Sequence, residues 1–443
     1  MSKTNLAQKT KAQLINRILG KKKSAGETAV TTPAVRPASR SEVPETFTRF
    51  DRHPGYEKML VTKAAASRLG VSNPFFRVHD GVAGATTRIE GREYINFSNY
   101  NYLGLAGHPA VGKAAKEAID RYGTSASASR LVAGERPVQR ELEEALAELY
   151  EVEDCVVFVS GHATNVSTIG YLFGPKDLVI HDSLVHNSIL EGIKLSGAAR
   201  RSFAHNDHQA VDDVLTEIRG QFERALIVVE GLYSMDGDIP NLPALIDIKR
   251  RHQVFLMVDE AHALGVLGET GRGVREHFGV AGKDVDIWMG TLSKTFAGCG
   301  GFIAGERALV ENLKYAAPGF VYSVGMSPPL AAASLEALRI MLREPERVGR
   351  LRAHARQFLQ QMHSIGINTG YAQGYAVVPA ITGSSLKAAK LSNQLFEAGI
   401  NVQPIIYPAV EEKAARLRFF LSALHNDREI DFTLKTLKRI VVA

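Results

Sequence analysis

The feature that most limits how this chain can fold is a series of short, continuously apolar segments that alternate with longer amphipathic ones. The apolar segments are rich in Val, Ile and Leu and read CVVFVS, LVIHD, ALIVVEG, FLMVDE and DIWMGT. Strands that are apolar on both faces are typical of a parallel sheet covered by helices. Between them, segments such as ELEEALAELYEV have the spacing of an amphipathic helix. The alternation predicts an α/β fold with a mostly parallel sheet.

A second, smaller α/β region is expected after Pro328 and Pro329. One long helix is predicted to run from there to about Gly366, followed by strands in AVVPAIT, NVQPII and LRFFLS and a final helix in REIDFTLKTLKRIV. A chain of 443 residues is long enough for more than one domain. The predicted division is a basic tail and linker at 1–46, an arm at 47–98, a large domain at 99–335 and a small C-terminal domain at 336–443. Within the arm, a helix is expected near 56–70 and a hairpin near 75–97.

The positive charge of the chain is concentrated at its N-terminus. Residues 1–40 contain nine Lys or Arg and one acid, a balance of +8, whereas the whole chain has +6, which leaves −2 for the remainder. Nucleic-acid binding by the body of the protein is therefore not expected. The tail has three open interpretations: docking on an acidic acyl carrier protein or a synthase subunit, contact with an anionic membrane, or a solvated segment without a partner.

Cysteine content and hydropathy favour a cytoplasmic protein. Cys155 and Cys299 lie far apart, without a CxxC motif, so a disulfide framework and a metal site are not expected. The N-terminus lacks the apolar core of a signal peptide, and no apolar run is long enough to span a membrane.

Polar residues follow the predicted strands directly, which is where ligands bind in open α/β sheets. Asp259 ends the apolar run FLMVD, and Lys294 lies in TLSKTFAGCGG, just after another strand. A lysine that forms a Schiff base and an acid that keeps a pyridine nitrogen protonated are the pair that a pyridoxal phosphate enzyme requires. The segment DEAH at 259–262 also occurs in helicases, but the phosphate loop that such a protein needs is missing from the sequence.

Eight motifs in order over about 320 residues bring a family to mind. They read NYNYLGLAGHP, GTSASASRLVAGE, FVSGHATN, HDSLVHNS, EGLYSMDGDIPNL, VDEAHALGVLGETGRG, TLSKTFAGCGG and RLRFFLSALH. The chain from about Phe47 onwards resembles the α-oxoamine synthases. This resemblance implies the pyridoxal-phosphate-dependent transferase fold of type I, which is aspartate aminotransferase-like, and a homodimer with active sites at the subunit interface.

The resemblance also implies a role for individual residues. Lys294 holds the cofactor, Asp259 faces its ring nitrogen, His262 donates to its phenolic oxygen, and His186 stacks on its ring and polarises the thioester. The implied phosphate and ring contacts are Gly161, His162, Ala163, Thr291, Ser234 and, across the dimer interface, Ser323. The implied substrate contacts are Arg418 for the amino-acid carboxylate, with Tyr100 and Asn101 nearby.

The implied reaction is a decarboxylative condensation of a small amino acid with an acyl thioester, with acyl-coenzyme A and acyl carrier protein both possible as donors. Tyr100 and Asn101 replace the Asn and Asp that many members carry, a variant similar to serine palmitoyltransferase that favours serine over glycine or alanine. Two alternatives stay open: another type I enzyme, such as an aminotransferase or aldolase, and a non-catalytic synthase subunit, which would not need Lys294.

Overall fold

The computed structural model describes residues 43–442, so the basic tail, on which the docking hypothesis depends, lies largely outside it. The chain divides into two compact units between Arg68 and Leu69. The described part of the first unit contains two short helical turns, Glu45–Phe47 and Phe50–Arg52, and helix α2 (Pro54–Arg68), where the sequence predicts a helix. No side chain of α2 is buried.

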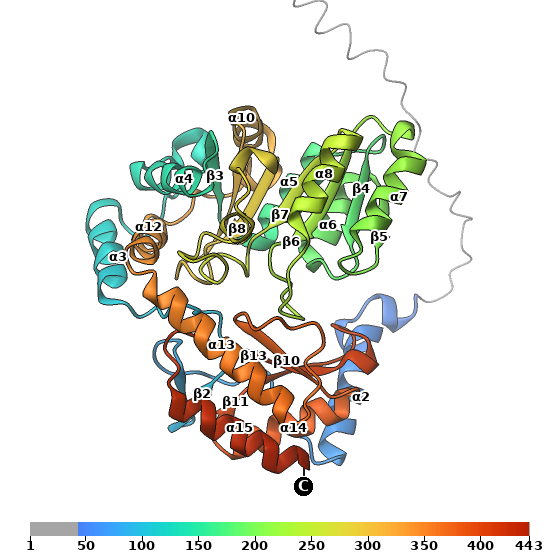
Figure 1. Cartoon of the computed structure of the whole chain (residues 1–443), viewed down its shortest axis with the longest axis vertical. Helices are drawn as coiled ribbons and strands as arrows, with labels where there is room; N and C mark the ends of the chain where they lie inside the picture. The colour runs from blue at the N-terminus through green and yellow to red at the C-terminus, as the bar shows by residue number, and fades with distance from the viewer. Residues whose placement is uncertain (1–42, 443) are drawn as a thin grey trace, which may run out of the picture. The chain divides into compact units, whose positions relative to one another are not determined.

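The second unit is built around a seven-stranded sheet (Figure 1). Its strand order is β3-β9-β8-β7-β6-β4-β5. The strands are β3 (Asp154–Phe158), β4 (Leu178–Asp182), β5 (Ala199–Phe203), β6 (Ala225–Glu230), β7 (Phe255–Asp259), β8 (Ile287–Thr291) and β9 (Gly301–Gly305). The five predicted apolar segments form β3, β4, β6, β7 and β8, which confirms the α/β prediction.

Alternate residues of the central strands enter two separate cores, one on each face of the sheet. In β6, Ile227 and Val229 belong to one core, and Leu226 and Val228 belong to the other. The first core is covered by α4 (Pro137–Tyr150), α7 (His208–Ile218), α8 (Leu242–His252) and α12 (Pro328–Arg343). The second core is covered by α5 (Gly161–Leu172), α6 (Asn187–Ser196), α10 (Arg307–Ala316) and α11 (Pro318–Val321). Burial on both faces explains why these strands are apolar throughout.

The structure differs from the sequence-based expectation in two strands and in the interruption of one long helix. Strand β9 is antiparallel to both of its neighbours, and with β5 it has no counterpart among the predicted strands. Glycine is depleted in strands, which hid β9; here Gly290 of β8 leaves room for Phe302 of β9, because a Cβ at Gly290 would lie 2.3 Å from the Phe302 ring. The single helix predicted after Pro328 is wrong: it is α12 followed by α13 (Glu346–Ser364), separated at Pro345, whose ring interrupts a helix.

Two three-stranded sheets make up the smaller part of this unit. One has the order β10-β13-β12, formed by β10 (Val377–Ile381), β12 (Gln403–Ile405) and β13 (Arg416–Phe420). The other joins β1 (Thr86–Ile89) and β2 (Arg92–Asn96) to β11 (Ile400–Asn401). Of the hairpin predicted near 75–97, the structure has the part that turns at Glu90–Gly91, while residues 75–85 contribute an isolated bridge from Asp80 to Arg88.

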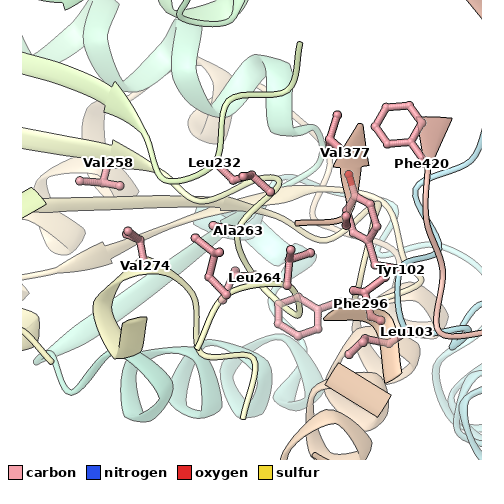
Figure 2. Close-up of a cluster of buried hydrophobic side chains, with 14 of the residues drawn as sticks. Tyr102, Leu103, Leu232, Val258, Ala263, Leu264, Val274, Phe296, Val377 and Phe420 are labelled. Atoms are coloured by element: carbon pink, nitrogen blue, oxygen red, sulfur yellow. The ribbon is translucent and has the colours of Figure 1, made fainter. Parts of the chain in front are cut away.

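Helices complete the second unit. They include α3 (Pro109–Tyr122), the short α9 (Val274–Phe278), α14 (Ser385–Glu397) and α15 (Asp427–Val442). Figure 2 shows part of the first core, in which Tyr102, Leu264 and Phe296 gather with Phe420 of β13. The domain boundaries given above remain a prediction. Across residues 43–442, no helix combines the length and hydropathy that a membrane span requires.

Candidate active site

A cavity of about 230 Å³ lies at the carboxyl ends of strands β6, β7 and β8. Its walls come from residues far apart in the sequence that the parallel sheet brings together. The lining residues are Ser160, Gly161, His162, Asn165, His186, Ser188, Glu230, Asp259, Ala261, His262, Met289, Thr291, Ser293, Lys294, Cys299 and Gly300. The cavity thus brings together seven of the predicted site residues: Gly161, His162, His186, Asp259, His262, Thr291 and Lys294.

Asp259 ends β7 and is only 4 % exposed. Its Oδ1 accepts a hydrogen bond from the backbone N–H of Ala261 at 3.0 Å, and its Oδ2 accepts one from Asn165 Nδ2 at 2.9 Å. These neutral donors orient the carboxylate without cancelling its charge. A carboxylate held in this way at the floor of a cavity fits a cationic ring nitrogen.

Lys294 follows β8 and reaches the same cavity from the next strand. Burial lowers the pKa of Lys294 to about 8, because an ammonium loses hydration there; Asp259 and Glu230 act in the opposite direction. The Nζ atom lies 5.4 Å from the centre of the Tyr100 ring. An amine with this pKa is available as a nucleophile near neutral pH.

Two histidines line the cavity, and the Nδ1 atom of each forms a hydrogen bond with a hydroxyl group. His262 Nδ1 lies 2.6 Å from the Tyr102 hydroxyl, and His186 Nδ1 lies 2.7 Å from Ser188 Oγ. Burial lowers the pKa of both imidazoles, and that of His262 falls well below its ordinary value. Burial therefore favours the neutral form of both rings.

The other end of the cavity has the features of an anion site. Helix α5 begins at Gly161, and its N-cap Ser160 accepts a hydrogen bond from the N–H of Ala163 at 3.3 Å. Free N–H groups and the helix dipole favour a phosphate there. A side chain at Gly161 would fill this space, because a Cβ would lie 2.9 Å from Thr291 Oγ1. His162, which also lines the cavity, is solvent-exposed.

The predicted substrate residues lie beside the cavity. Arg418 on β13 donates from Nη1 to the carbonyl oxygen of Ser234 at 2.9 Å, and its Nη2 lies 3.5 Å from the Tyr100 hydroxyl. The buried Nε of Arg418 has no partner within residues 43–442. Asn101 is different, because its amide nitrogen donates to the carbonyl of Ala83 and its amide oxygen accepts from the N–H of Ala106. Those bonds hold the loop that carries Tyr100.

Three further predicted residues are not among those that line the cavity. The N–H of Ser234 donates to Glu230 Oε2 at 3.2 Å, so its backbone links the cavity to Arg418. Ala163 lies in the first turn of α5, one residue beyond His162. Ser323 lines a separate small pocket beside Arg130, and its predicted role across a dimer interface remains a prediction.

Asn165 and Glu230 have no role in the sequence-based prediction, yet both line the cavity. Asn165 binds Asp259, while its Oδ1 is buried without a partner among the described residues. Glu230 pairs with Asp259 in the register of β6 and β7, and its Oε1 is likewise unpartnered. Burial, followed by the charge of Asp259, raises the pKa of Glu230 to about 8. The sequence does place Glu230 at the ligand-binding edge of the sheet, because it ends the apolar run ALIVVEG, but it assigns no role to this residue.

These residues fit pyridoxal phosphate. The lining of the cavity includes a buried carboxylate, an anion cradle at a helix N-terminus and a buried amine. Asn165 Oδ1 and Glu230 Oε1 are buried without partners among residues 43–442, and a ring with polar substituents could form hydrogen bonds with them. Among residues 43–442, no group of His, Cys, Asp and Glu is arranged to hold a metal ion.

Comparisons with known proteins agree on the family of this chain. Residues 92–437 match the family described as aminotransferase class I and II. The 8-amino-7-oxononanoate synthase of Thermoanaerobacter pseudethanolicus is 37 % identical over 363 residues, covering 82 % of this chain and 91 % of that protein. The enzyme of the same name from Symbiobacterium thermophilum is 40 % identical over 352 residues, covering 80 % and 89 %.

Solved structures agree with the sequence matches. Serine palmitoyltransferase of Sphingomonas wittichii superposes with a TM-score of 0.83 at 30 % identity, covering 87 % of this chain and 97 % of that one. A serine palmitoyltransferase structure that contains pyridoxal phosphate gives a TM-score of 0.82 at 28 % identity, with the same coverage. The predicted type I fold is thereby confirmed. The chain belongs to the aminotransferase class I and II family and, within it, to the α-oxoamine synthases, pyridoxal-phosphate-dependent acyltransferases that condense an amino acid with an acyl thioester.

Proposed function

We propose that the protein condenses a small L-amino acid, namely serine, glycine or alanine, with an acyl thioester, and that the products are an α-amino ketone, CO₂ and a free thiol. The observation that carries this proposal is the convergence of Lys294, Asp259 and His186 on one cavity, with Arg418 beside it. Pyridoxal phosphate, when bound, supplies an electron-accepting ring that stabilises negative charge at the α-carbon of the amino acid.

Lys294 would first hold the cofactor and then serve as the base. Its pKa of about 8, lowered by burial, means that the amine can both accept and release a proton near neutral pH. Asp259 stays hydrogen-bonded by Asn165 and Ala261 and therefore presents a fixed charge to the ring nitrogen. Lys294 would thus hold the aldehyde carbon of the cofactor, and Asp259 would face its ring nitrogen.

Arg418 would bind the carboxylate of the amino acid. Its guanidinium is already oriented by the Ser234 carbonyl and stacks over Phe420, with the guanidinium carbon 4.6 Å from the ring centre. The planar guanidinium fork suits a carboxylate, and its Nε has no partner among residues 43–442. Tyr100 lies close to both Arg418 and Lys294, so its ring limits the space for the amino-acid side chain. This position supports a small substrate.

His186 would face the ring and the incoming thioester. Ser188 holds its Nδ1, so the other ring nitrogen is left for the cavity. A neutral imidazole that donates a hydrogen bond to the thioester oxygen would stabilise the charge that develops there. Burial lowers the pKa of His186, which favours this neutral form.

A matrix of substrates tests the proposal. Serine, glycine, alanine and a larger amino acid are each offered with short and long acyl groups on coenzyme A and on acyl carrier protein, and CO₂ and thiol release are measured. Equal release of both from a small amino acid is the expected result. Formation of a keto acid without thiol release would instead identify an aminotransferase, and cleavage of serine without CO₂ would identify an aldolase. A purified protein that binds no cofactor would favour the non-catalytic subunit.

We further propose that the active unit is a homodimer in which Ser323 of one subunit completes the site of the other. Large apolar side chains near Ser323 support this, since Val132, Tyr322 and Val324 are 82 %, 86 % and 52 % exposed. Chains carrying Lys294→Ala and Ser323→Ala are mixed by unfolding and refolding together. Because random pairing repairs one site in each hybrid dimer, about a quarter of the wild-type activity should return. No recovery would contradict a shared site.

The basic N-terminal segment is proposed to favour carrier-bound donors. Its balance of +8 over residues 1–40 is complementary to an acidic protein such as an acyl carrier protein. A chain that begins after residue 40 should then have a higher KM for acyl carrier protein donors and an unchanged KM for coenzyme A donors. Equal rates with both donors before and after truncation would remove the idea. A change confined to assays with anionic vesicles would favour membrane contact instead.

A further inference from the structure

The Tyr102 hydroxyl has one hydrogen-bond partner within the described part of the chain, namely His262 Nδ1 at 2.6 Å. Tyr102 is fully buried, and Figure 2 shows its ring among Leu103, Phe296 and other apolar side chains. A phenol hydroxyl always carries a proton to donate unless it ionises, and burial raises the pKa of Tyr102 well above its ordinary value. The proton of this hydroxyl therefore needs an acceptor.

His262 offers that acceptor only in one of its two neutral forms. If Nδ1 carries no proton, it accepts from Tyr102 and the ring proton is on Nε2. If Nδ1 is protonated, it donates to the phenol oxygen, and the buried Tyr102 proton has no acceptor. Leaving a buried donor unpaired lowers the population of that second form by roughly 5- to 150-fold. A doubly protonated ring is disfavoured as well, because burial, together with Lys294 and Arg418, lowers the pKa of His262 well below its ordinary value.

The free edge of His262 is directed at the cavity. His262 lines the cavity, whereas Tyr102 does not, so the edge that carries Nε2 is the one available to a ligand. The imidazole is also fixed in orientation: it lies nearly parallel to the Phe420 ring, at 11° and 6.2 Å, and edge-on to Tyr100 at 5.7 Å. Tyr102 thus holds both the position and the protonation pattern of this ring.

We propose that Tyr102 is a positioning residue that keeps the proton of His262 on Nε2, so that His262 is a hydrogen-bond donor to the phenolic oxygen of the cofactor. The inference rests on the function proposed above only for the identity of the acceptor. The tautomer itself is a property of the protein without cofactor. Tyr102 can enforce it because its phenol supplies one donor, and His262 Nδ1 is the one acceptor that the described residues offer to it.

Nitrogen NMR of histidine-labelled protein tests the tautomer directly. The His262 signals are assigned by their absence in His262→Gln. In the cofactor-free wild type, the tautomer with the proton on Nε2 should be at least about fivefold more populated than the tautomer with the proton on Nδ1. In Tyr102→Phe this preference should fall at least about fivefold, because the donor to Nδ1 is gone. With the cofactor bound, the same variant should shift the pH midpoint of the cofactor's visible absorbance. A wild-type proton on Nδ1, or an unchanged tautomer in Tyr102→Phe, would overturn the proposal.

Tyr150→Phe is the matched control. Tyr150 is also fully buried, but its hydroxyl has no partner within residues 43–442, its ring packs against Trp288, and it is not among the residues that line the cavity. Losing that hydroxyl should leave the His262 tautomer and the absorbance midpoint at their wild-type values. Should the wild-type tautomer be as proposed while no amino acid and thioester react, the proposed function fails and the role of Tyr102 stands. If Tyr102→Phe does not fold, the wild-type spectrum still decides the tautomer.

Discussion

The reactivity of Lys294 can be predicted quantitatively from its burial. Its pKa is about 8, where an ordinary lysine has 10.5. At pH 7 this leaves about 9 % of the amine unprotonated, against about 0.03 % for an ordinary lysine, a difference of roughly 300-fold. Because only the unprotonated amine attacks an aldehyde, Lys294 should bond covalently to pyridoxal phosphate far faster than any exposed lysine.

The assay follows the growth of visible absorbance after pyridoxal phosphate is added to cofactor-free protein, from about pH 6 to about pH 10. The initial rate should rise with a midpoint near 8. Reduction with borohydride followed by peptide mass analysis should place the cofactor on Lys294, and Lys294→Ala should leave that peptide unmodified. A midpoint near 10 would refute the argument that burial controls this amine.

Two charge-removing variants give a stricter test, because they should move the midpoint in opposite directions. The charge of Asp259 raises the pKa of Lys294, so Asp259→Asn should lower the midpoint. The charge of Arg418 lowers the pKa of Lys294, so Arg418→Gln should raise it. Shifts in the same direction would show that a rearrangement of the cavity, and not its electrostatics, controls the amine.

Three further predictions concern the scaffold around the site. Gly161→Ala should weaken cofactor binding at least about tenfold in an equilibrium titration, since its Cβ would lie 2.9 Å from Thr291 Oγ1 and crowd the phosphate cradle; unchanged affinity would argue against a phosphate there. Gly237→Ala should lower the free energy of unfolding in urea by about 2 kcal/mol or more, since φ is +76° and its Cβ would lie 2.1 Å from the Val377 carbonyl oxygen; a smaller loss would mean that the loop moves freely. Burial lowers the pKa of His205, but Asp182 and Asp238 on either side of the ring raise it to about 10. The contribution of His205 to stability is therefore complete below pH 6.5 and is lost as the pH rises to about 10. Unfolding measured against pH should show this loss in the wild type, and a loss of the same size in His205→Gln would contradict it.

Much of the site could be predicted because its residues end strands that are readable in the sequence. Asp259 and Lys294 each follow an apolar run, and the parallel sheet then places both at one edge. Gly161 was recognisable for a similar reason, as the first residue of a helix directly after a strand. For each of these residues, the local sequence pattern and the topology of the sheet both indicate a position at the ligand-binding edge.

Residues that act through non-local contacts could not be found in this way. Tyr102 reaches His262 across 160 positions of sequence, and nothing in its own motif indicates a histidine partner. Glu230 ends a readable apolar run, but its position directly beside Asp259 depends on the order of the strands. Asn101 gains a structural role in the same non-local way, through its hydrogen bonds to Ala83 and Ala106, while its place near the substrate stays a prediction.

Burial acts on four groups of the cavity in the same sense, towards their neutral forms. It lowers the pKa of Lys294, His186 and His262 and raises that of Glu230. Burial thus favours the neutral forms of both imidazoles and of Glu230, whereas Lys294, with a pKa of about 8, is still mostly protonated at pH 7. Asp259, whose carboxylate is held by two neutral donors, is left to match a cationic ring nitrogen at the floor of the cavity. Burial at the strand ends therefore does more than exclude water, because it brings the pKa of Lys294 and of Glu230 to about 8, where both can exchange a proton near neutral pH.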